Sequence, residues 1–441
     1  MKLLNTYKHY ITITFLVAIL LLGLFLRHYN YRAFPRHGAT FDEFAWTWLG
    51  INLIQKGVPV SWSSQPQYAN KSHLVYQGAA FWIVTPYLEH PPFFGLISGG
   101  VALLNGAKDM YDVTLAAIRP LALFLGVLSV FFVFLLTKEL YGKKIALLSS
   151  LIYATVPTTV IGSRIVQNEN FMIPMWLISL YLLHKYLKSG RTRFRNAAAI
   201  VAGILSISKV PWLVVGFSLS LILSYKSKWR DAITVGFIVL AVFSLYILYG
   251  IYFYKNLFLN LWRLQTARYD ISFIGFYSVF IKPLLVDRFF LDGWIFFGWF
   301  SIFLLSRDFK KHFMILIPFL SYLLIYVFAI PDEPMHGWYR YPFYPFLLIS
   351  SAFVLKDEFQ KISLVSLFFI ILVGLSLFGN YWTDVFGFSY FIYRLFIIAA
   401  FGTIFIFYWK KKYARIASSC LAGWFLIFII LNILTIVNYI E

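Results

Sequence analysis

Two adjacent carboxylates, Asp42 and Glu43, offer the most direct chemistry in this sequence of 441 residues. A carboxylate beside a bound substrate can take the proton from an acceptor hydroxyl, which is the task of a general base. Acids in the first turn of a helix also stabilise its N-terminus. Position alone supports the structural and the catalytic role equally, and we keep both residues as catalytic candidates.

Basic residues at the ends of several apolar segments could bind an anion. One lysine or arginine in such a place is explained by a side chain that reaches toward lipid headgroups. Several cations on the same side as the acids instead favour a site for a lipid phosphate or pyrophosphate. The candidates are Arg119, Arg164, Lys209 and Arg340.

Glu89 and His90 precede the proline pair Pro91-Pro92 and an apolar stretch. The prolines fix the entry of a helix and need no functional explanation. Glu89 and His90 could bind a metal or a phosphate, but a metal site needs three or four ligands. We therefore predict no metal site and no cofactor; a divalent cation is possible but is not expected to be required.

The composition indicates a membrane protein. Apolar residues make up 61% of the chain and charged residues 13%, against about 25% charged in an ordinary globular domain. These values exclude a soluble enzyme, a coiled coil and a disordered chain. The single cysteine, Cys420, cannot form an internal disulfide or a thiolate metal cluster.

Apolar runs of about 20 residues, the length that crosses a bilayer, recur along the sequence. They predict an all-α polytopic fold with about thirteen transmembrane helices in a single domain, residues 1–441, without a soluble C-terminal domain. Residues 28–113 form a first outer loop and residues 253–290 a second. The predicted helices are 11–27, 114–137, 145–162, 171–187, 196–208, 210–225, 231–252, 291–305, 312–330, 341–355, 362–379, 389–409 and 416–440.

The positions of the basic residues predict the orientation. With these spans, seven short basic clusters fall on one side of the membrane, which the positive-inside rule makes cytoplasmic. The N-terminus is then inside and Glu441 outside, and the clusters account for most of the net charge of +20 without a nucleic-acid partner. They are Lys2/Lys8, Lys138/Lys143/Lys144, Lys185/Lys188/Arg191/Arg193/Arg195, Lys226/Lys228/Arg230, Arg307/Lys310/Lys311, Lys356/Lys361 and Lys410/Lys411/Lys412/Arg415.

The outer side collects most of the acids, so chemistry is expected there. Two apolar stretches of the first outer loop, 44–54 and 91–104, are predicted to be helices that lie in the membrane interface. The first of them places Phe44, Trp48 and Ile51 near one helical stripe, which is the pattern of an interfacial helix.

The combination of these motifs resembles the GT-C glycosyltransferases, in the branch of the protein O-mannosyltransferases and the lipid A aminoarabinose transferases. The first 225 residues carry most of the likeness. The order of the motifs relative to the spans makes the resemblance fairly specific. The motifs are FDEFAWTWLGINLIQKGVP at 41–59, EHPPFFGLI at 89–97, residues 119–164 followed by Glu169, ILSISKVPW at 204–212, and RYPFYPFLL at 340–348.

The resemblance implies a transferase that moves a sugar from a polyprenyl-phosphate carrier to an acceptor hydroxyl on the outer face, with inversion. The acceptor would be a glycan, a lipid or a protein, and the enzyme would work among membrane lipids. Asp42 would then be the base with Glu43 in support. The carrier phosphate would be held by Lys209, Arg340, His90 and Arg164, with Glu89, Arg119, Glu169 and Tyr341 as further site candidates.

The sequence departs from the aminoarabinose branch at two positions, since Ala45 and His90 stand where that branch tends to have arginine and lysine. Two other functions stay open. A transporter or lipid flippase would also need many spans and charged residues in the membrane, but it predicts paired halves with broken helices, and no such pairing is visible. A non-catalytic scaffold would leave the acids and cations dispensable.

Overall fold

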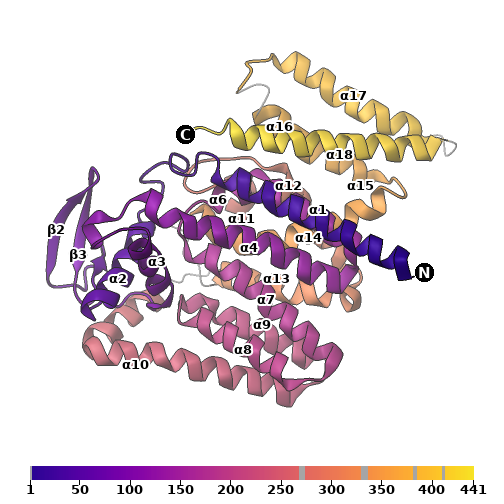
Figure 1. Ribbon diagram of the computed structural model, residues 1–441. Helices are drawn as coiled ribbons and strands as arrows, with labels where there is room; N and C mark the ends of the chain where they lie inside the picture. The colour runs from indigo at the N-terminus through magenta and orange to yellow at the C-terminus, as the bar shows by residue number, and fades with distance from the viewer. Residues whose placement is uncertain (1, 268–273, 329–335, 381–384, 410–412) are drawn as a thin grey trace.

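The computed structural model describes residues 2–267, 274–328, 336–380, 385–409 and 413–441. Helices make up most of these residues and pack side by side, with one small sheet at the edge of the bundle (Figure 1). The two chain termini lie at opposite ends, and the sheet projects from the end away from the N-terminus (Figure 1). We call the end that carries residues 29–113 the loop end. The prediction of an all-α membrane fold is confirmed, apart from this sheet.

Each of the thirteen predicted spans corresponds to helical structure. The longer helices are α1 (Lys2–His28), α4 (Leu115–Tyr141), α5 (Lys143–Thr155), α7 (Asn168–Ser189), α8 (Thr192–Ser206), α9 (Leu213–Tyr225), α10 (Trp229–Ala267), α12 (Gly293–Ser306), α13 (Phe309–Phe328), α14 (Tyr344–Glu358), α17 (Tyr390–Trp409) and α18 (Ala414–Val437). The shorter ones are α6 (Pro157–Gly162), α11 (Ile274–Ile281), α15 (Leu364–Phe369), α16 (Leu375–Phe378), the 3₁₀ helices η1 (Met110–Asp112), η2 (Val210–Trp212) and η3 (Gly337–Phe343), and the π-helix η4 (Ile370–Gly374).

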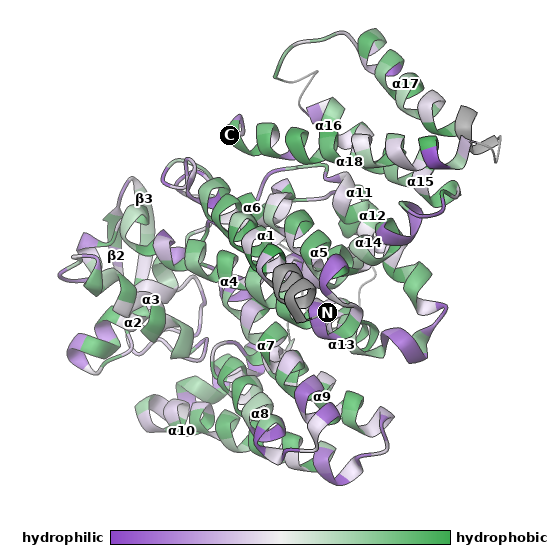
Figure 2. Cartoon of the chain, turned by 45° about the vertical axis from the view of Figure 1, so that its right-hand side comes forward, coloured by the Kyte–Doolittle hydropathy of each residue, from purple (hydrophilic) through white to green (hydrophobic). Residues whose placement is uncertain are grey.

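The number of spans stays a prediction. Among the described residues, five helices are long and apolar enough to cross a bilayer, namely Tyr10–His28, Leu115–Tyr141, Trp229–Ala267, Phe309–Phe328 and Ala414–Val437. Apolar residues cover most of the helices, and polar residues gather in the turns and at the loop end (Figure 2). The basic residues 410–412 lie outside the described residues.

Two predicted elements differ from the structure in detail. The segment 145–162 is two helices, because Val156 precedes Pro157 and takes an extended conformation, as a residue before proline prefers. The segment 253–290 is largely helical and not an extended loop. Helix α10 has a non-helical residue, Tyr254, at the predicted end of the span and then continues to Ala267.

The first loop folds into two helices and a sheet. Helices α2 (Asp42–Lys56) and α3 (Phe93–Leu104) match the predicted pair. They pack in direct contact. This close approach requires a glycine, because a Cβ on Gly50 would lie only 1.8 Å from the carbonyl oxygen of Gly95. Between them β1 (Ser61–Trp62), β2 (Lys71–Tyr76) and β3 (Ala79–Val84) form an antiparallel sheet in the order β1-β3-β2.

This sheet accounts for the apolar stripe of α2. Phe44, Trp48 and Ile51 are completely buried. The rings of Phe44 and Trp48 lie 6.2 and 5.1 Å from that of Phe81 on β3, and both also meet Tyr76 on β2. The stripe therefore packs against the sheet, which the sequence analysis did not predict, instead of facing lipid.

The C-terminal residue Glu441 reaches the loop end. Its carboxylate accepts a hydrogen bond of 2.8 Å from the backbone N–H of Arg36, in the chain that leaves α1. Arg36 also forms an ion pair with Asp287, 2.6 Å apart. The end of α18 and the first loop thus lie on the same side of the bundle, opposite the N-terminus.

Candidate active site

The two adjacent carboxylates at the start of α2 have different surroundings. Glu43 is 1% exposed and accepts hydrogen bonds from Nε and Nη2 of Arg119, at 3.1 and 3.0 Å, and from the backbone N–H of Val166 at 3.0 Å. The third guanidinium nitrogen of Arg119, Nη1, donates to two backbone carbonyls of the chain that follows α1. The Glu43 carboxylate is therefore saturated and joins α2, α4 and the first loop.

Asp42 is partly exposed, and only one of its two carboxylate oxygens accepts a hydrogen bond in the part of the chain that the structure describes. Its Oδ2 accepts a hydrogen bond of 3.2 Å from Nε2 of Gln167, and the same Nε2 donates to Oγ1 of Thr40 at 2.8 Å. Within the described residues, Oδ1 of Asp42 has no recorded hydrogen bond. One oxygen thus fixes the side chain while the other is available to take a proton, which is the geometry that a general base needs.

Lys209 and Glu169 form a buried ion pair beside this carboxylate. Lys209 lies between α8 and η2, and its Nζ donates to Oε1 of Glu169, in the first turn of α7, at 2.6 Å. The ammonium also lies over the rings of Trp212 and Tyr339, 5.4 and 5.0 Å from their centroids. The carboxylate and the two aromatic faces fix its position.

Asp42, Lys209 and His336 influence one another electrostatically. Burial would lower the pKa of Lys209, but Glu169, with smaller contributions from Tyr339 and Asp42, raises that pKa above its usual value. Burial lowers the pKa of His336, Asp42 opposes this shift and Lys209 adds to it. The structure therefore brings the predicted residues Asp42, Glu169 and Lys209 into one cluster, which we call the Asp42 cluster together with Gln167 and His336.

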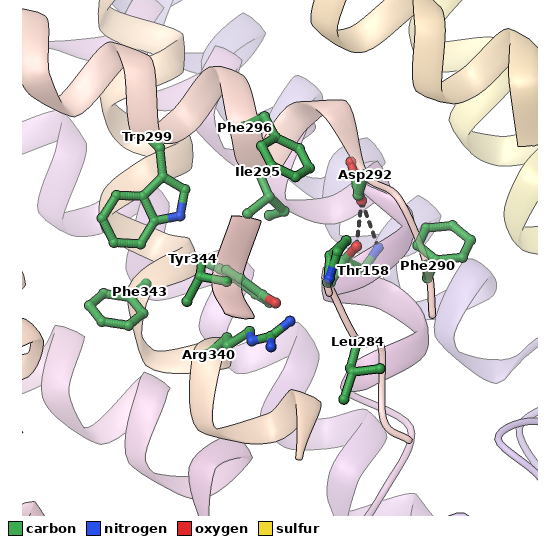
Figure 3. A pocket seen from close by; sticks show the side chains of 12 residues that line it. Thr158, Leu284, Phe290, Asp292, Ile295, Phe296, Trp299, Arg340, Phe343 and Tyr344 are labelled. Carbon is green, nitrogen blue, oxygen red and sulfur yellow. Dashed lines mark hydrogen bonds between the residues drawn. The ribbon is translucent and has the colours of Figure 1, made fainter. Parts of the chain in front are cut away.

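Arg340 faces a different recess, between η3, α11 and α12 (Figure 3). Its Nη1 donates to the carbonyl of Lys282 at 3.0 Å. Neither Asp42 nor Lys209 lines this recess. Most of its walls are apolar, with Arg340, Asp292, Thr158 and Tyr344 as the polar residues; the others are Val279, Pro283, Leu284, Phe290, Ile295, Phe296, Trp299 and Phe343.

A guanidinium between apolar walls suits an amphiphilic anion. The Asp292 carboxylate, which also lines the recess, caps α12 at Trp294 and accepts two hydrogen bonds from Thr158, at 3.0 and 2.6 Å (Figure 3). Arg340 directly follows Tyr339, whose ring covers Lys209. The recess and the Asp42 cluster are therefore neighbours along η3.

Two predicted cations contact the chain itself. Arg119 binds Glu43, as described above. Arg164 is fully buried and donates to the carbonyls of Leu26 and Phe34 at 2.8 and 3.4 Å. The sequence analysis named Arg164 with the phosphate-binding residues and Arg119 as a further site candidate. In the structure both guanidinium groups bind the chain that leaves α1. Their guanidinium groups do not line the recess of Arg340.

Glu89 and His90 lie just before α3, and the ring of His90 contacts α2. The His90 ring is 5.0 Å from that of Trp46. Burial raises the pKa of Tyr87, and Glu89 and Asp42 both raise it further. Tyr87 thus lies within electrostatic range of both carboxylates. Among the described residues, no group of three or more His, Cys, Asp or Glu is arranged to hold a metal ion.

Tyr341 positions η3. Its hydroxyl donates to the carbonyl of Leu285 at 2.5 Å, and its ring lies against Gly162 at the end of α6. A Cβ on Gly162 would come within 2.6 Å of Cζ of Tyr341. The tyrosine therefore locks the segment that carries Tyr339 and Arg340 against α6.

The sequence analysis missed Gln167, Thr40 and His336. A signal for Gln167 was present, because four polar residues in succession, 167–170, open an otherwise apolar helix. His336 directly follows residues 331–335, which lie outside the described residues and include the acids at positions 332 and 333. Its proximity to Asp42 depends on a fold that joins residues almost 300 positions apart, and spacing gives no hint of it.

Comparison with known proteins agrees with this architecture. Residues 89–252 match the family model described as dolichyl-phosphate-mannose-protein mannosyltransferase, a little over a third of the chain. No curated protein sequence matches significantly.

Solved structures show the same fold at low identity. ArnT from Cupriavidus metallidurans bound to undecaprenyl phosphate is 15% identical with a TM-score of 0.57, over 96% of this chain and 77% of that one. The oligosaccharyltransferase AglB from Archaeoglobus fulgidus, with an inhibitory peptide and a dolichol-phosphate, is 15% identical with a TM-score of 0.52, over 94% of this chain. This chain spans 56% of the length of the archaeal enzyme. The resemblance to the GT-C membrane glycosyltransferases is therefore confirmed at the level of the fold.

Proposed function

We propose that this protein is a glycosyltransferase that moves a sugar from a polyprenyl-phosphate carrier to an acceptor hydroxyl at the loop end of the bundle. The observation that carries the proposal is the Asp42 carboxylate, with one oxygen held by Gln167 and the other available, beside a buried lysine. The fold supports it, because both solved structures named above contain a polyprenyl or dolichyl phosphate.

In the proposed reaction Asp42 takes the proton of the acceptor hydroxyl as its oxygen attacks the anomeric carbon. The bond between that carbon and the carrier phosphate breaks, and the phosphate leaves with the electron pair. Attack from the side opposite the leaving group inverts the configuration. Cations near the leaving oxygen stabilise its developing charge, and we assign this task to Arg340 together with Lys209.

We assign the head of the carrier to the recess of Arg340. Its polyprenyl chain would contact apolar residues such as Phe296 and Trp299, and its phosphate would meet the guanidinium (Figure 3). We assign Glu43 and Arg119 a supporting role, since their bonding is complete. Because cations of the chain meet the phosphate charge, the reaction needs no metal ion, and EDTA should leave its rate unchanged.

We further propose that the loop end faces outward and the N-terminus faces the cytoplasm. The asymmetry of the basic clusters supports this orientation. The acceptor hydroxyl would then belong to a glycan, lipid or protein outside the cell.

The proposal is tested with purified full-length protein and radiolabelled polyprenyl-phosphate-linked sugars. We expect label to move from the carrier to an acceptor in a membrane extract, and Asp42→Asn to slow transfer by about 10²- to 10⁴-fold with carrier binding unchanged. Asp112→Asn, an exposed change in the same loop, is the matched control. An active Asp42→Asn variant would refute the role of Asp42. Carrier that crosses vesicle bilayers with its sugar still attached would indicate a flippase instead.

A further inference from the structure

A short hairpin, residues 283–290, forms part of the wall of the recess of Arg340. Its two arms pair antiparallel. Leu284 and Phe290, one from each arm, line the recess (Figure 3). Asp287 lies in the turn that joins the arms. A displacement of this hairpin would therefore change the shape of the site that we assign to the head of the carrier.

Hydrogen bonds to its backbone carbonyls hold the hairpin on η3. The carbonyls of Val286 and Leu285 accept hydrogen bonds of 2.8 and 2.5 Å from Gly337 and Tyr341. Arg340, also on η3, donates to the carbonyl of the residue before the hairpin at 3.0 Å. These bonds fix the hairpin relative to the guanidinium group without any contribution from the side chain in its turn.

The turn of the hairpin is bonded to the first loop by that side chain. Both oxygens of the Asp287 carboxylate accept hydrogen bonds from the guanidinium group of Arg36, at 3.0 and 2.6 Å, and Glu441 meets the same guanidinium at 3.5 Å. The side chains of Arg36 and Asp287 are 35% and 28% exposed, and such an ion pair contributes little to stability. Its two parallel hydrogen bonds nevertheless fix the orientation of both groups.

The backbone next to Arg36 is in turn held in place relative to Asp42. Arg119 donates to the carbonyl of Pro35 at 2.8 Å, and the same guanidinium group donates two hydrogen bonds to Glu43, the neighbour of Asp42. A continuous series of bonded groups therefore links the proposed base to the turn of the hairpin.

The charge of Asp287 also acts on the Asp42 cluster. Burial lowers the pKa of His336, and two carboxylates oppose this shift, Asp42 and, to a smaller extent, Asp287. His336 directly precedes η3, on which the hairpin rests. The base and the turn of the hairpin are thus within electrostatic range of the same histidine.

We propose that Arg36 is a positioning residue of the transfer reaction, which sets the carrier recess against the base Asp42 through its ion pair with Asp287. The inference rests on the function proposed above and adds a residue to its mechanism. The acceptor oxygen must attack in line with the bond to the carrier phosphate, and a misplacement of about 1 Å can lower the rate of such a step by roughly 100-fold. Loss of the ion pair should lower this rate and spare carrier binding, because the hairpin keeps its bonds to η3.

The test measures two quantities on the purified full-length protein. They are the rate of label transfer per folded molecule at saturating carrier, in the assay proposed above, and the affinity for undecaprenyl phosphate. Arg36→Gln and Asp287→Asn should each lower the rate by about 10- to 100-fold, with the affinity unchanged within about twofold.

A charge exchange separates positioning from a general loss of structure. The double variant Arg36→Asp/Asp287→Arg restores an ion pair of reversed polarity. It should transfer label several-fold faster than either half of the exchange alone, because only the double variant restores the attraction between the first loop and the hairpin.

Glu139→Gln is the matched control. Glu139 binds Lys185 and Lys188, 2.7 and 2.9 Å away, near the C-terminal end of α4, and the side chains of Lys185 and Glu139 are 32% and 20% exposed. This variant should change neither the rate nor the affinity.

Four results would count against the inference. Wild-type rates in Arg36→Gln and Asp287→Asn, a parallel loss of rate and affinity, or a double variant no faster than its halves would overturn the role of Arg36 alone. A wild-type protein that transfers no label would refute the proposed reaction, and this role with it.

Discussion

Asp42 and Glu43 are neighbours in the chain, yet they belong to opposite kinds of environment. Glu43 is enclosed by donors from α4 and the loop before α7, and its charge is matched by Arg119. Asp42 shares one neutral donor, Gln167, with Thr40. The difference follows from helix geometry, because successive residues of α2 point about 100° apart.

The comparison separates a scaffold from a reactive region. Saturated charged groups hold the first loop on the bundle, and groups with one oxygen unbonded within the described residues gather at Asp42, Gln167 and Glu169. A charged residue in a membrane protein is therefore not sufficient evidence of a functional site. Its bonding state distinguishes the two cases, and the following predictions test that distinction.

The largest effect is expected when the scaffold pair is broken. Arg119→Leu leaves the Glu43 carboxylate buried without its counter-charge, which should cost about 3 to 5 kcal/mol. Thermal unfolding of the purified protein should show a large drop in melting temperature. Arg193→Leu, an exposed change in the first turn of α8, should have almost no effect.

The double variant Glu43→Leu/Arg119→Leu sharpens this test. It removes both charges, so part of the lost stability should return. If Arg119→Leu proved as stable as the wild type, the ion pair of Arg119 and Glu43 would not stabilise the fold as its geometry indicates.

Much of the fold could be predicted from the sequence, because apolar runs and their lengths report helices directly. The helices at 44–54 and 91–104 were also predictable. The sheet was not, since the alternation of apolar residues in β2 is weak and its partner β3 is apolar at nearly every position. The stripe of Phe44, Trp48 and Ile51 was assigned to lipid for the same reason.

For the site, the sequence identified residue types but not their partners. Asp42, Glu169 and Lys209 were named as candidates and lie together. Arg119 and Arg164 were named on equal terms, but both bind the chain itself. Some cations bind a buried carboxylate and others face a recess. No local sequence pattern distinguishes the two cases, because the difference depends on contacts between distant segments.

Arg340 and Arg164 provide the second test. Arg340→Leu should weaken binding of undecaprenyl phosphate by about 10- to 100-fold, since a charge-assisted hydrogen bond contributes roughly 1.5 to 3 kcal/mol. Arg164→Leu should lower stability while the protein that remains folded binds the carrier normally. Titration of both variants with the carrier measures the difference. Equal losses of affinity would place Arg164 in the binding site after all.

Gly162 tests how η3 is positioned. A methyl group there would meet the ring of Tyr341, so Gly162→Ala should shift η3 and cost about 1 to 3 kcal/mol of stability. Carrier affinity should fall several-fold because Arg340 lies on η3. The combination Gly162→Ala/Tyr341→Leu should relieve the clash, although it loses the hydrogen bond to Leu285. If Gly162→Ala bound carrier with full affinity, the position of Arg340 would not depend on this contact.

The smallest effect concerns acid sensitivity at His336, on the reactive side of the comparison. Its pKa in the folded protein lies below the usual value, chiefly because of burial. The unfolded chain therefore binds a proton at a higher pH than the folded chain does. Stability is complete above the unfolded pKa, about 6.5, and decreases as the pH falls from there toward the folded pKa.

His336→Gln removes this titration. The variant should lose less melting temperature than the wild type between pH 7 and pH 5, with a difference of at most a few degrees. His73→Gln, an exposed change on β2, is the control and should leave the pH profile unchanged. A steeper loss in His336→Gln would mean that protonation of His336 stabilises the fold, and the negative charge of Asp42 would then outweigh burial at this position.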